Sequence, residues 1–297
     1  MKLILSEEQQ FLKDTAQSFA RDKTPTNHFR KMRDNGNAKC WDDSIWQEMV
    51  QLGWSGILVP EEFGGSDFGI AGISVIMQEL GKTLTPSPLL ATSVLGVSTI
   101  KLLGSDEQKT TYLPKIVSGE ATLALAVDEG NHHNPFDIEA TATLEGDKWT
   151  LNGQKVFIID GASADFILIV ARTSGKKGES NGLSVFIADK NSTGLEVSQI
   201  STADCRNYAN LVMSNLSLNA EALLGEVDIA GEIIEQVLDL GRIAMASEML
   251  GNTEEAFEIT VSYLKERKQF GVLIGSFQAL QHRAAKMFCE IELTKSA

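Results

Sequence analysis

The hydrophobic period of this chain changes twice along its 297 residues, and the change restricts the possible folds more than any single motif. As far as residue 118, apolar side chains recur at helical spacing, beginning just after a Ser6–Gln9 pair with the spacing of a capping box. The spacing then shortens to two residues, with Gly-containing turns, before the helical period returns. The sequence therefore predicts an α+β protein: an N-terminal helical domain over 1–118, a central antiparallel β-barrel domain over 119–220 and an incomplete C-terminal helical bundle over 221–297.

The acidic composition argues against anionic binding partners. Lys and Arg together number 26 against 40 Asp and Glu, which gives a formal net charge of -14. Because a field of this sign repels nucleic acid and anionic membrane surfaces, we expect neither as a partner. Cys40, Cys205 and Cys289 are odd in number and far apart, which favours a reducing compartment over a disulfide framework. The first residues turn acidic too early for a signal peptide, and no apolar run reaches the roughly 18 residues of a membrane span. We therefore expect a cytoplasmic protein.

A helix corner near the end of the chain carries a distinctive pattern. The apolar period that begins near Asp228 runs into Glu-Arg-Lys-Gln-Phe-Gly (266–271), where Gly271 ends the helix. A second helical pattern follows Ser276 and opens with Phe-Gln-Ala-Leu-Gln-His (277–282). Taken alone, this stretch is equally consistent with an exposed basic corner between two helices.

Seven short motifs, including this corner, occur in an order that resembles the acyl-CoA dehydrogenase family along the entire chain. They are Leu-Gly-Trp (52–54), Pro-Glu-Glu-Phe-Gly-Gly (60–65), Glu-Leu-Gly-Lys (79–82), Leu-Pro-Lys-Ile-Val-Ser-Gly-Glu (113–120), Leu-Asn-Gly-Gln-Lys (151–155), Gly-Ala-Ser-Ala-Asp (161–165) and Arg-Lys-Gln-Phe-Gly (267–271). The resemblance implies FAD-dependent α,β-dehydrogenation of an acyl-CoA thioester, with electron-transfer flavoprotein as the acceptor. It also implies a dimer or tetramer, possibly heteromeric. Family members continue for two or three further helices.

The resemblance also assigns positions around the cofactor. Arg267, Phe270 and Gln278 correspond to family residues that reach across a subunit interface to the adenosine-pyrophosphate end of a neighbour's FAD. On the ring side, Ala126 precedes the segment 127–134, which replaces the family's Thr-Glu-Pro-Gly-Ala-Gly-Ser-Asp and begins with Val127. Phe157 and Ile159 stand at the Trp and Thr positions of the family's Trp-Ile-Thr-Asn segment. Val127 and Ile159 offer no hydroxyl, so we expect weaker recognition of the ring edge, by about 0.5–1.5 kcal/mol per lost hydrogen bond.

The catalytic base that the resemblance implies is a Glu, and this chain does not show it. In most members it lies beyond the stretch matched here; in a minority it immediately precedes the position of Arg242, which in this chain is Gly241. Glu248 and Glu254 or Glu255 are alternatives by proximity alone. Asp239 and Arg242 have the spacing of an intrahelical ion pair. They are either structural or, by the resemblance, substrate-binding residues at the thioester end of the channel.

Two alternatives to the enzyme remain open. One is a degenerate, non-catalytic subunit of a heteromeric acyl-CoA dehydrogenase; the other is a flavin-dependent monooxygenase on the same fold. His132 and His133 lack companions for a four-ligand metal site, and we interpret them as part of a solvated loop, with no metal expected. Lys176 and Lys177 are interpreted as solvated too, with contact to an anionic nucleotide as the alternative.

Overall fold

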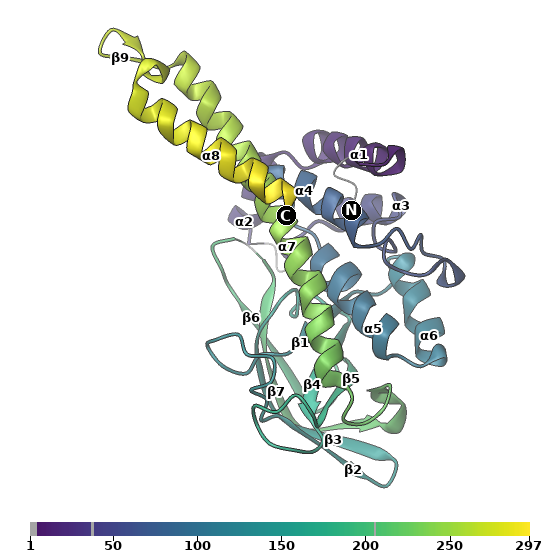
Figure 1. Cartoon of the computed structure of the whole chain (residues 1–297). Coiled ribbons are helices and arrows are strands. Elements are labelled where there is room, and N and C mark those ends of the chain that lie inside the picture. The colour runs from purple at the N-terminus through teal and green to yellow at the C-terminus, as the bar shows by residue number, and fades with distance from the viewer. Residues whose placement is uncertain (1–4, 37–38, 205) are drawn as a thin grey trace. The chain divides into compact units, whose positions relative to one another are not determined.

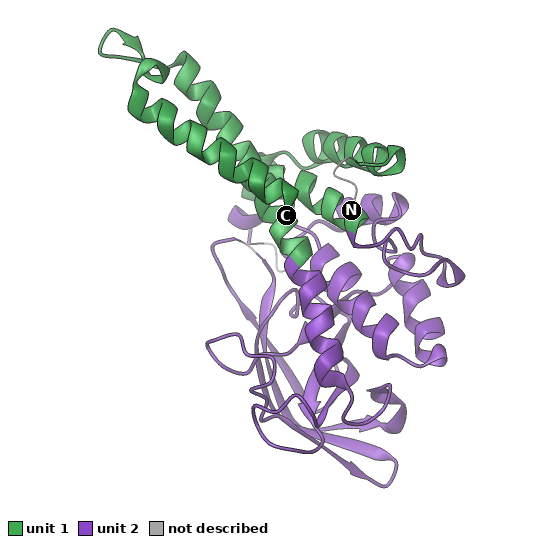
Figure 2. Cartoon of the chain, in the orientation of Figure 1, with its two compact units in different colours: residues 1–30, 71–85, 243–297 green, residues 31–70, 86–242 purple. Residues whose placement is uncertain are grey.

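The computed structural model describes residues 5–36, 39–204 and 206–297, so the expectations for the first four residues and Cys205 lie outside it. The described chain forms two compact units (Figure 2). The first comprises residues 1–30, 71–85 and 243–297; the second comprises residues 31–70 and 86–242. Long helix α7 (Ala230–Glu266) contributes its first part to the second unit and the rest to the first. Among the described helices, none is both long and apolar enough to cross a membrane.

The part of the chain before the sheet is helical, as the apolar period predicts (Figure 1). Its elements are α1 (Glu7–Lys23), α2 (Thr26–Asp34), α3 (Asp43–Gln51), η1 (Glu61–Phe63), α4 (Ile70–Thr83), η2 (Leu89–Gly96), α5 (Val97–Leu103) and α6 (Asp106–Val117). The predicted capping box at α1 is confirmed, because the Ser6 hydroxyl accepts from the Gln9 backbone N–H and the Gln9 side chain accepts from the Ser6 N–H. Ser105 and Gln108 form the same arrangement at α6.

The sheet is mixed, which corrects the expectation of a purely antiparallel one. Its strands are β1 (Leu123–Ala126), β2 (Thr141–Glu145), β3 (Lys148–Ile158), β4 (Phe166–Arg172), β5 (Leu183–Asp189), β6 (Leu195–Ile200), β7 (Tyr208–Asn219) and β8 (Leu223–Leu224). They pair in the order β6-β7-β3-β2-β4-β5-β8, and β1 joins β4 in parallel through pairs such as Leu125 with Leu168 (Figure 1). The physical reason is burial. All four residues of β1 and most of β4 are buried, which is typical of parallel pairing and is not specified by local alternation.

In the first unit, α4 and α7 approach so closely that two glycines are required. A Cβ added to Gly251 would lie 1.8 Å from the Gln78 carbonyl oxygen, and one added to Gly81 would lie 2.2 Å from the Glu248 carbonyl oxygen. Beside this contact, Glu254 accepts from Gln78 at 2.9 Å and from Lys295 at 2.7 Å. Helix α8 (Gln278–Ser296), which carries Lys295, lies alongside α7 within this unit (Figure 1).

A buried ion pair anchors the segment after β1 to strand β3. The Lys155 side chain is fully buried, and its Nζ donates to the Glu129 carboxylate at 2.7 Å and to the Val127 carbonyl at 2.9 Å. Glu129 also accepts from the backbone N–H groups of Glu139 and Ala140. Burial lowers the pKa of Lys155 to about 8, although the Glu129 carboxylate opposes the shift. The ion pair therefore closes the 129–140 loop onto the sheet.

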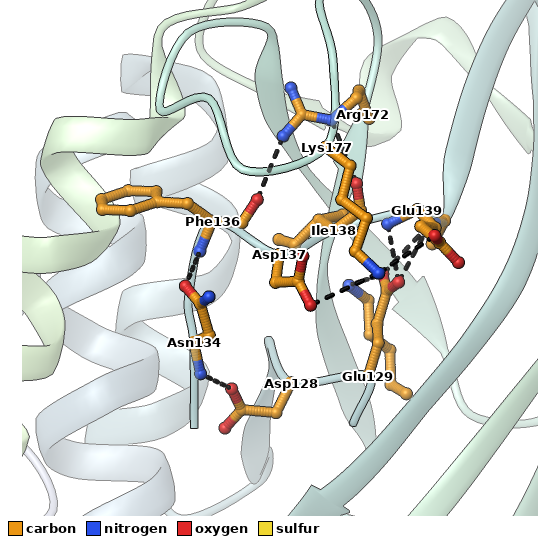
Figure 3. Close-up of polar contacts among 11 residues, drawn as sticks. Asp128, Glu129, Asn134, Phe136, Asp137, Ile138, Glu139, Arg172 and Lys177 are labelled. Atoms are coloured by element: carbon orange, nitrogen blue, oxygen red, sulfur yellow. Dashed lines mark hydrogen bonds and ion pairs between the residues drawn. The ribbon is translucent and has the colours of Figure 1, made fainter. Parts of the chain in front are cut away.

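A buried arginine holds the two loops at this edge of the sheet. The Arg172 guanidinium donates to the carbonyl oxygens of Phe136, Ile138, Ser174, Glu179 and Asn181. Figure 3 shows the contact with Phe136. Backbone carbonyl oxygens thus satisfy all of the Arg172 N–H donors. The same hydrogen bonds hold the 136–138 segment against the loop of residues 174–181. Lys177 adds exposed contacts to Asp137 and Glu139. The solvated-loop interpretation of Lys177 therefore misses these ion pairs.

The glycine contact predicts that Gly251→Ala destabilises the protein by about 1–3 kcal/mol, because the new methyl group meets rigid backbone. Gly241 on the same helix provides the matched control. A Cβ there meets the flexible end of Leu95 at 2.7 Å, and the helix gains up to about 1 kcal/mol from Gly→Ala. Urea unfolding of both variants measures the difference. Equal stability of the two variants would contradict the close approach of α4 and α7.

The Lys155 pKa predicts a specific pH dependence of stability. Between the folded pKa of about 8 and the ordinary value of 10.5, the unfolded chain binds more protons than the folded one. The unfolding free energy contributed by this group therefore rises with pH across that window, by up to ~3 kcal/mol. Lys155→Met removes the rise. The test is the difference in unfolding free energy between wild type and variant at several pH values; a difference that stays constant would contradict the shifted pKa.

Candidate active site

A small hollow in the second unit gathers several of the expected ring-side residues. It has a volume of about 150 Å³ and lies where the end of β1, the end of β3 and the first part of α7 converge. We call it the Phe157 hollow. Its lining residues are Leu95, Leu125, Val127, Asp128, His133, Val156, Phe157, Ile158, Ile159 and Leu238. Val127, Phe157 and Ile159 are thus brought together, whereas Ala126 is fully buried within β1 and does not line the hollow.

Phe157 is presented to the hollow by an irregularity of strand β3. The β3–β7 register shifts between Lys155 and Ile158, which leaves Phe157 without a cross-strand pair. The residue has φ 55°, a conformation that costs a non-glycine residue about 1 kcal/mol or more. Its N–H donates to the Asn210 side chain, and its ring contacts Tyr208 at 5.1 Å between centroids. The Phe157 side chain remains 58% exposed, so an aromatic face is available at the rim.

The polar side of the hollow is formed by the loop after β1. The Asp128 carboxylate accepts from His133 Nδ1 at 2.8 Å and from the Asn134 backbone N–H at 3.1 Å (Figure 3 shows the Asn134 contact). His133 Nε2 faces the Arg242 guanidinium at 3.4 Å. His133 and His132 both lie in an exposed loop, as interpreted from the sequence, and His133 in addition contacts Asp128 and Arg242 through its two ring nitrogens.

Asp239 and Arg242 form the ion pair that their spacing predicts. Arg242 contacts Asp239 and, one turn further back, Glu235 at 2.9 Å. Hydrogen bonds to Asp239 and Glu235 hold the pKa of Arg242 above its ordinary value. The same guanidinium reaches His133, so this part of α7 is joined to the loop after β1. Gly241 points toward Leu95, one of the residues that line the hollow.

The carboxylates considered as substitutes for the missing base lie in the other unit. Glu248, Glu254 and Glu255 belong to the part of α7 that packs in the first unit. Burial alone would raise the pKa of Glu254, but hydrogen bonds from Lys295 and Gln78 hold it below its ordinary value. A carboxylate held in this way is a weaker base. None of the three lines the Phe157 hollow.

The residues expected at the adenosine-pyrophosphate end lie at a short hairpin and at the start of α8 in the first unit. Strands β9 (Lys268–Gln269) and β10 (Val272–Leu273) form a tight turn in which Phe270 and Gly271 both have positive φ, 52° and 81°. The Arg267 carbonyl accepts from the Ile274 N–H. Phe270 is 90% exposed and packs edge-on against Phe277, the residue before Gln278. Arg267, Phe270 and Gln278 therefore share one exposed corner.

The residues of the Phe157 hollow fit one side of a flavin. An isoalloxazine ring packs well against apolar and aromatic surface, which Val127, Ile159 and the exposed Phe157 ring supply. Asp128 and His133 are the polar side chains at its edge. Pockets that enclose a whole ligand measure about 300–1,000 Å³, so this wall accommodates only part of the ring.

Asp128 and His133 were missed by sequence reasoning. The nearest signal was within the 127–134 segment, where Asp128 keeps an acid at the position of the family's Glu and His133 replaces the family's Ser. The spacing of five residues in a loop carries no geometric rule, unlike the three- or four-residue spacing of a helix. Among the described residues, no group of three His, Cys, Asp or Glu side chains could hold a metal ion.

Comparison with known proteins places the chain in a family. Sequence models of the acyl-CoA dehydrogenase N-terminal, middle and C-terminal domains match residues 6–120, 127–219 and 231–297. The 3-(aryl)acrylate reductase of Clostridium sporogenes is 32% identical over 264 residues, which cover 84% of this chain and 68% of that protein. The caffeyl-CoA reductase-Etf complex subunit CarC of Acetobacterium woodii is 29% identical over 300 residues, covering 99% and 78%. The butyryl-CoA dehydrogenase structure from Megasphaera elsdenii superposes with a TM-score of 0.87 at 28% identity, covering 99% and 78%. The chain therefore belongs to the acyl-CoA dehydrogenase family of FAD-dependent oxidoreductases.

Proposed function

We propose that the protein catalyses α,β-dehydrogenation of an acyl-CoA thioester. The observation that carries the proposal is the Phe157 hollow, which presents an apolar and aromatic wall beside the Asp239–Arg242 pair in a chain that matches the family over almost its whole length. When bound, FAD supplies the acceptor for the hydride that leaves the β carbon.

Residues of this chain would contact both the flavin ring and the thioester group of the substrate. Phe157 packs against the flavin ring, and Val127 and Ile159 exclude water from its edge. Asp239 and Arg242 line the thioester end of the substrate channel, where the guanidinium offers donors to a carbonyl oxygen.

The adenosine-pyrophosphate end of FAD would be bound at a subunit boundary. Arg267, Phe270 and Gln278 are exposed at the corner before α8 and available to a neighbouring subunit's cofactor. Exposed apolar side chains on α7 and α8, such as Ile259 and Leu293 at 61% and 68%, support a dimer or tetramer, homomeric or heteromeric. One relative is a subunit of a reductase-Etf complex, which supports electron-transfer flavoprotein as the redox partner. A cytoplasmic location stays a prediction from the sequence.

A second candidate is the non-catalytic subunit of a heteromeric dehydrogenase. Gly241 favours it, because the position that supplies a Glu in a minority of the family carries no side chain here. The small volume of the Phe157 hollow favours it too. Such a subunit would complete a partner's FAD site through Arg267 and Gln278 and would itself catalyse nothing.

The first test is optical. Purified protein with its partners should carry oxidised flavin, and anaerobic addition of an acyl-CoA thioester should bleach the flavin absorbance, because hydride transfer reduces the ring. Free acid without CoA serves as the control and should leave the spectrum unchanged. Bound flavin that no thioester bleaches would favour the non-catalytic subunit, whereas absence of flavin would overturn the cofactor assignment.

A second prediction compares the two ends of the cofactor. Arg267→Ala should weaken FAD binding by about 1.5–3 kcal/mol, because a charged hydrogen bond to phosphate is lost. That change corresponds to roughly 10- to 150-fold in the dissociation constant. Ile159→Thr restores a hydroxyl at the ring edge and should retain or strengthen binding. Flavin absorbance after gel filtration measures both variants, and the reverse ranking would refute the assignment of Arg267.

A further inference from the structure

The loop after β1 is anchored at both ends and exposed in between. The buried Lys155 and Arg172 side chains hold the two ends. Residues 130–134 between these anchors are exposed. Among the described residues, every hydrogen bond of this stretch stays within the loop except one, in which the imidazole of His133 meets Arg242 of α7. His133 therefore joins the exposed part of the loop to the helix.

The contact between His133 and Arg242 requires a neutral imidazole. Nδ1 lies 2.8 Å from the Asp128 carboxylate, which only accepts hydrogen bonds, so Nδ1 carries the proton of the neutral ring. Nε2 lies 3.4 Å from Nη2 of Arg242, which only donates, so Nε2 accepts. That distance is long for an N–H donor, which makes this hydrogen bond weak. A change of charge on the ring is therefore sufficient to break it.

A second proton on the ring reverses the contact with Arg242. Both nitrogens of an imidazolium donate, so Nε2 would then face a guanidinium that also only donates, and two positive charges would meet. The Asp128 carboxylate favours the charged ring, because opposite charges attract. Protonation therefore keeps His133 on Asp128 and detaches it from α7.

The titratable and charged groups around the imidazole lie on three elements. They are Asp128 and Glu129 of the loop, Lys155 of β3, and Glu235, Asp239 and Arg242 of α7. Hydrogen bonds to the two α7 carboxylates hold the pKa of Arg242 above its ordinary value, so the guanidinium stays charged. Burial lowers the pKa of Lys155 to about 8, so this group is largely charged below pH 7. Histidine side chains usually change charge between about pH 5 and 8, and a comparison below pH 7 therefore reports on His133.

We propose that His133 is a pH-sensitive latch, a contact that joins the loop after β1 to helix α7 when the imidazole is neutral and releases it when the imidazole is protonated. The inference rests on the proposed function, which places the flavin ring at the Phe157 hollow. His133 and Asp128 form the polar side of that hollow, so the closed latch holds part of the cofactor site in its binding conformation. Acidification should therefore release the loop and weaken FAD binding.

The first measurement is the protonation pattern of the ring. The chain has four histidines, so ¹⁵N-histidine labelling of the holoprotein, with any partners it requires, gives few NMR signals, and His133→Gln identifies those of His133. At about pH 8 the shifts should show a protonated Nδ1 and an unprotonated Nε2, and near pH 5 both nitrogens should be protonated. A proton on Nε2 at about pH 8 would overturn the latch, because that nitrogen could not accept from Arg242.

The second measurement is the rate at which the holoprotein releases FAD, followed by flavin fluorescence after dilution. From about pH 7 to 5.5 the wild-type rate should rise about 2- to 10-fold relative to that of His133→Gln, the range for one hydrogen bond. The Gln side-chain oxygen accepts from Arg242 at either pH. His133→Leu has no acceptor and should release FAD fast at both pH values. The matched control is His132→Gln at the exposed neighbour, which should follow the wild type.

Two further variants separate the latch from a general loss of structure. Asp128 accepts from the Asn134 N–H through Oδ1 and faces His133 through Oδ2. In Asp128→Asn the amide keeps the first acceptor and donates to Nδ1, which moves the ring proton to Nε2. This variant should release FAD as fast as His133→Leu. In an Arg242→Met background, His133→Leu should have no further effect, because the contact is already absent.

The outcomes distinguish this inference from the proposed function. If acidification speeds FAD release equally in the wild type and in His133→Gln, the latch is refuted and the flavin assignment stands. The same holds if His133→Leu retains FAD as well as the wild type does at about pH 7. If the protein carries no flavin, the proposed function and the effect of the latch on FAD fail together, and the ¹⁵N signals alone decide whether the imidazole changes as the latch requires.

Discussion

The ion pair between Lys155 and Glu129 is the interaction on which the proposed active site depends. A fully buried ammonium group is costly unless it is paired and hydrogen-bonded, and here it is satisfied by one carboxylate and one backbone carbonyl. The pair ties the middle of β3 to the residue just beyond β1, two segments that are not neighbours in the sheet order. Because Glu129 is fixed by Lys155, the pair also sets where the following loop residues, including His133, begin.

Two adjacent acids in this segment have opposite environments and therefore different consequences. Glu129 turns inward, where its carboxylate is paired with Lys155 and accepts hydrogen bonds from the backbone of the 139–140 segment. Asp128 turns to the rim, where it meets an imidazole. Alternation of side-chain direction along extended backbone is sufficient to separate them. Asp128 and Glu129 are thus consecutive residues with separate partners, and a substitution of one is expected to disturb the contacts of the other.

Much of the architecture could be predicted, and the remainder depends on contacts that no local pattern encodes. The Ser6 capping box and the long apolar period of α7 are local signals, and both are confirmed in the structure. Strand β7 was not distinguished within the β region, because its inward side chains are interrupted near Asn215, which has φ 51°. The parallel pairing of β1 with β4 joins segments about forty residues apart, and alternation cannot specify a partner at that distance.

The same reasoning applies to the site. The Asp239–Arg242 pair follows from helical spacing and is present, whereas the contact of Arg242 with His133 joins residues 109 apart in sequence. The exposed face of Phe157 depends on a register shift between β3 and β7, and no turn residue in the sequence predicts that shift. The resemblance to the family gave the positions of Val127 and Ile159, whereas the contact between Asp128 and His133 is specific to this chain and is seen only in the structure.

The three glycines of α7 differ in what surrounds them: two lie against backbone and one lies against a side chain. Each glycine inside a helix costs about 1 kcal/mol relative to alanine, so each needs a compensating reason. Gly231 and Gly251 have one, because a Cβ would lie 2.0 Å from the Ser180 carbonyl oxygen and 1.8 Å from that of Gln78. Gly241 does not, because its Cβ would meet only the end of the Leu95 side chain, which can rotate. Packing therefore leaves Gly241 unexplained, whereas a role in keeping the space beside Leu95 open to a substrate accounts for it.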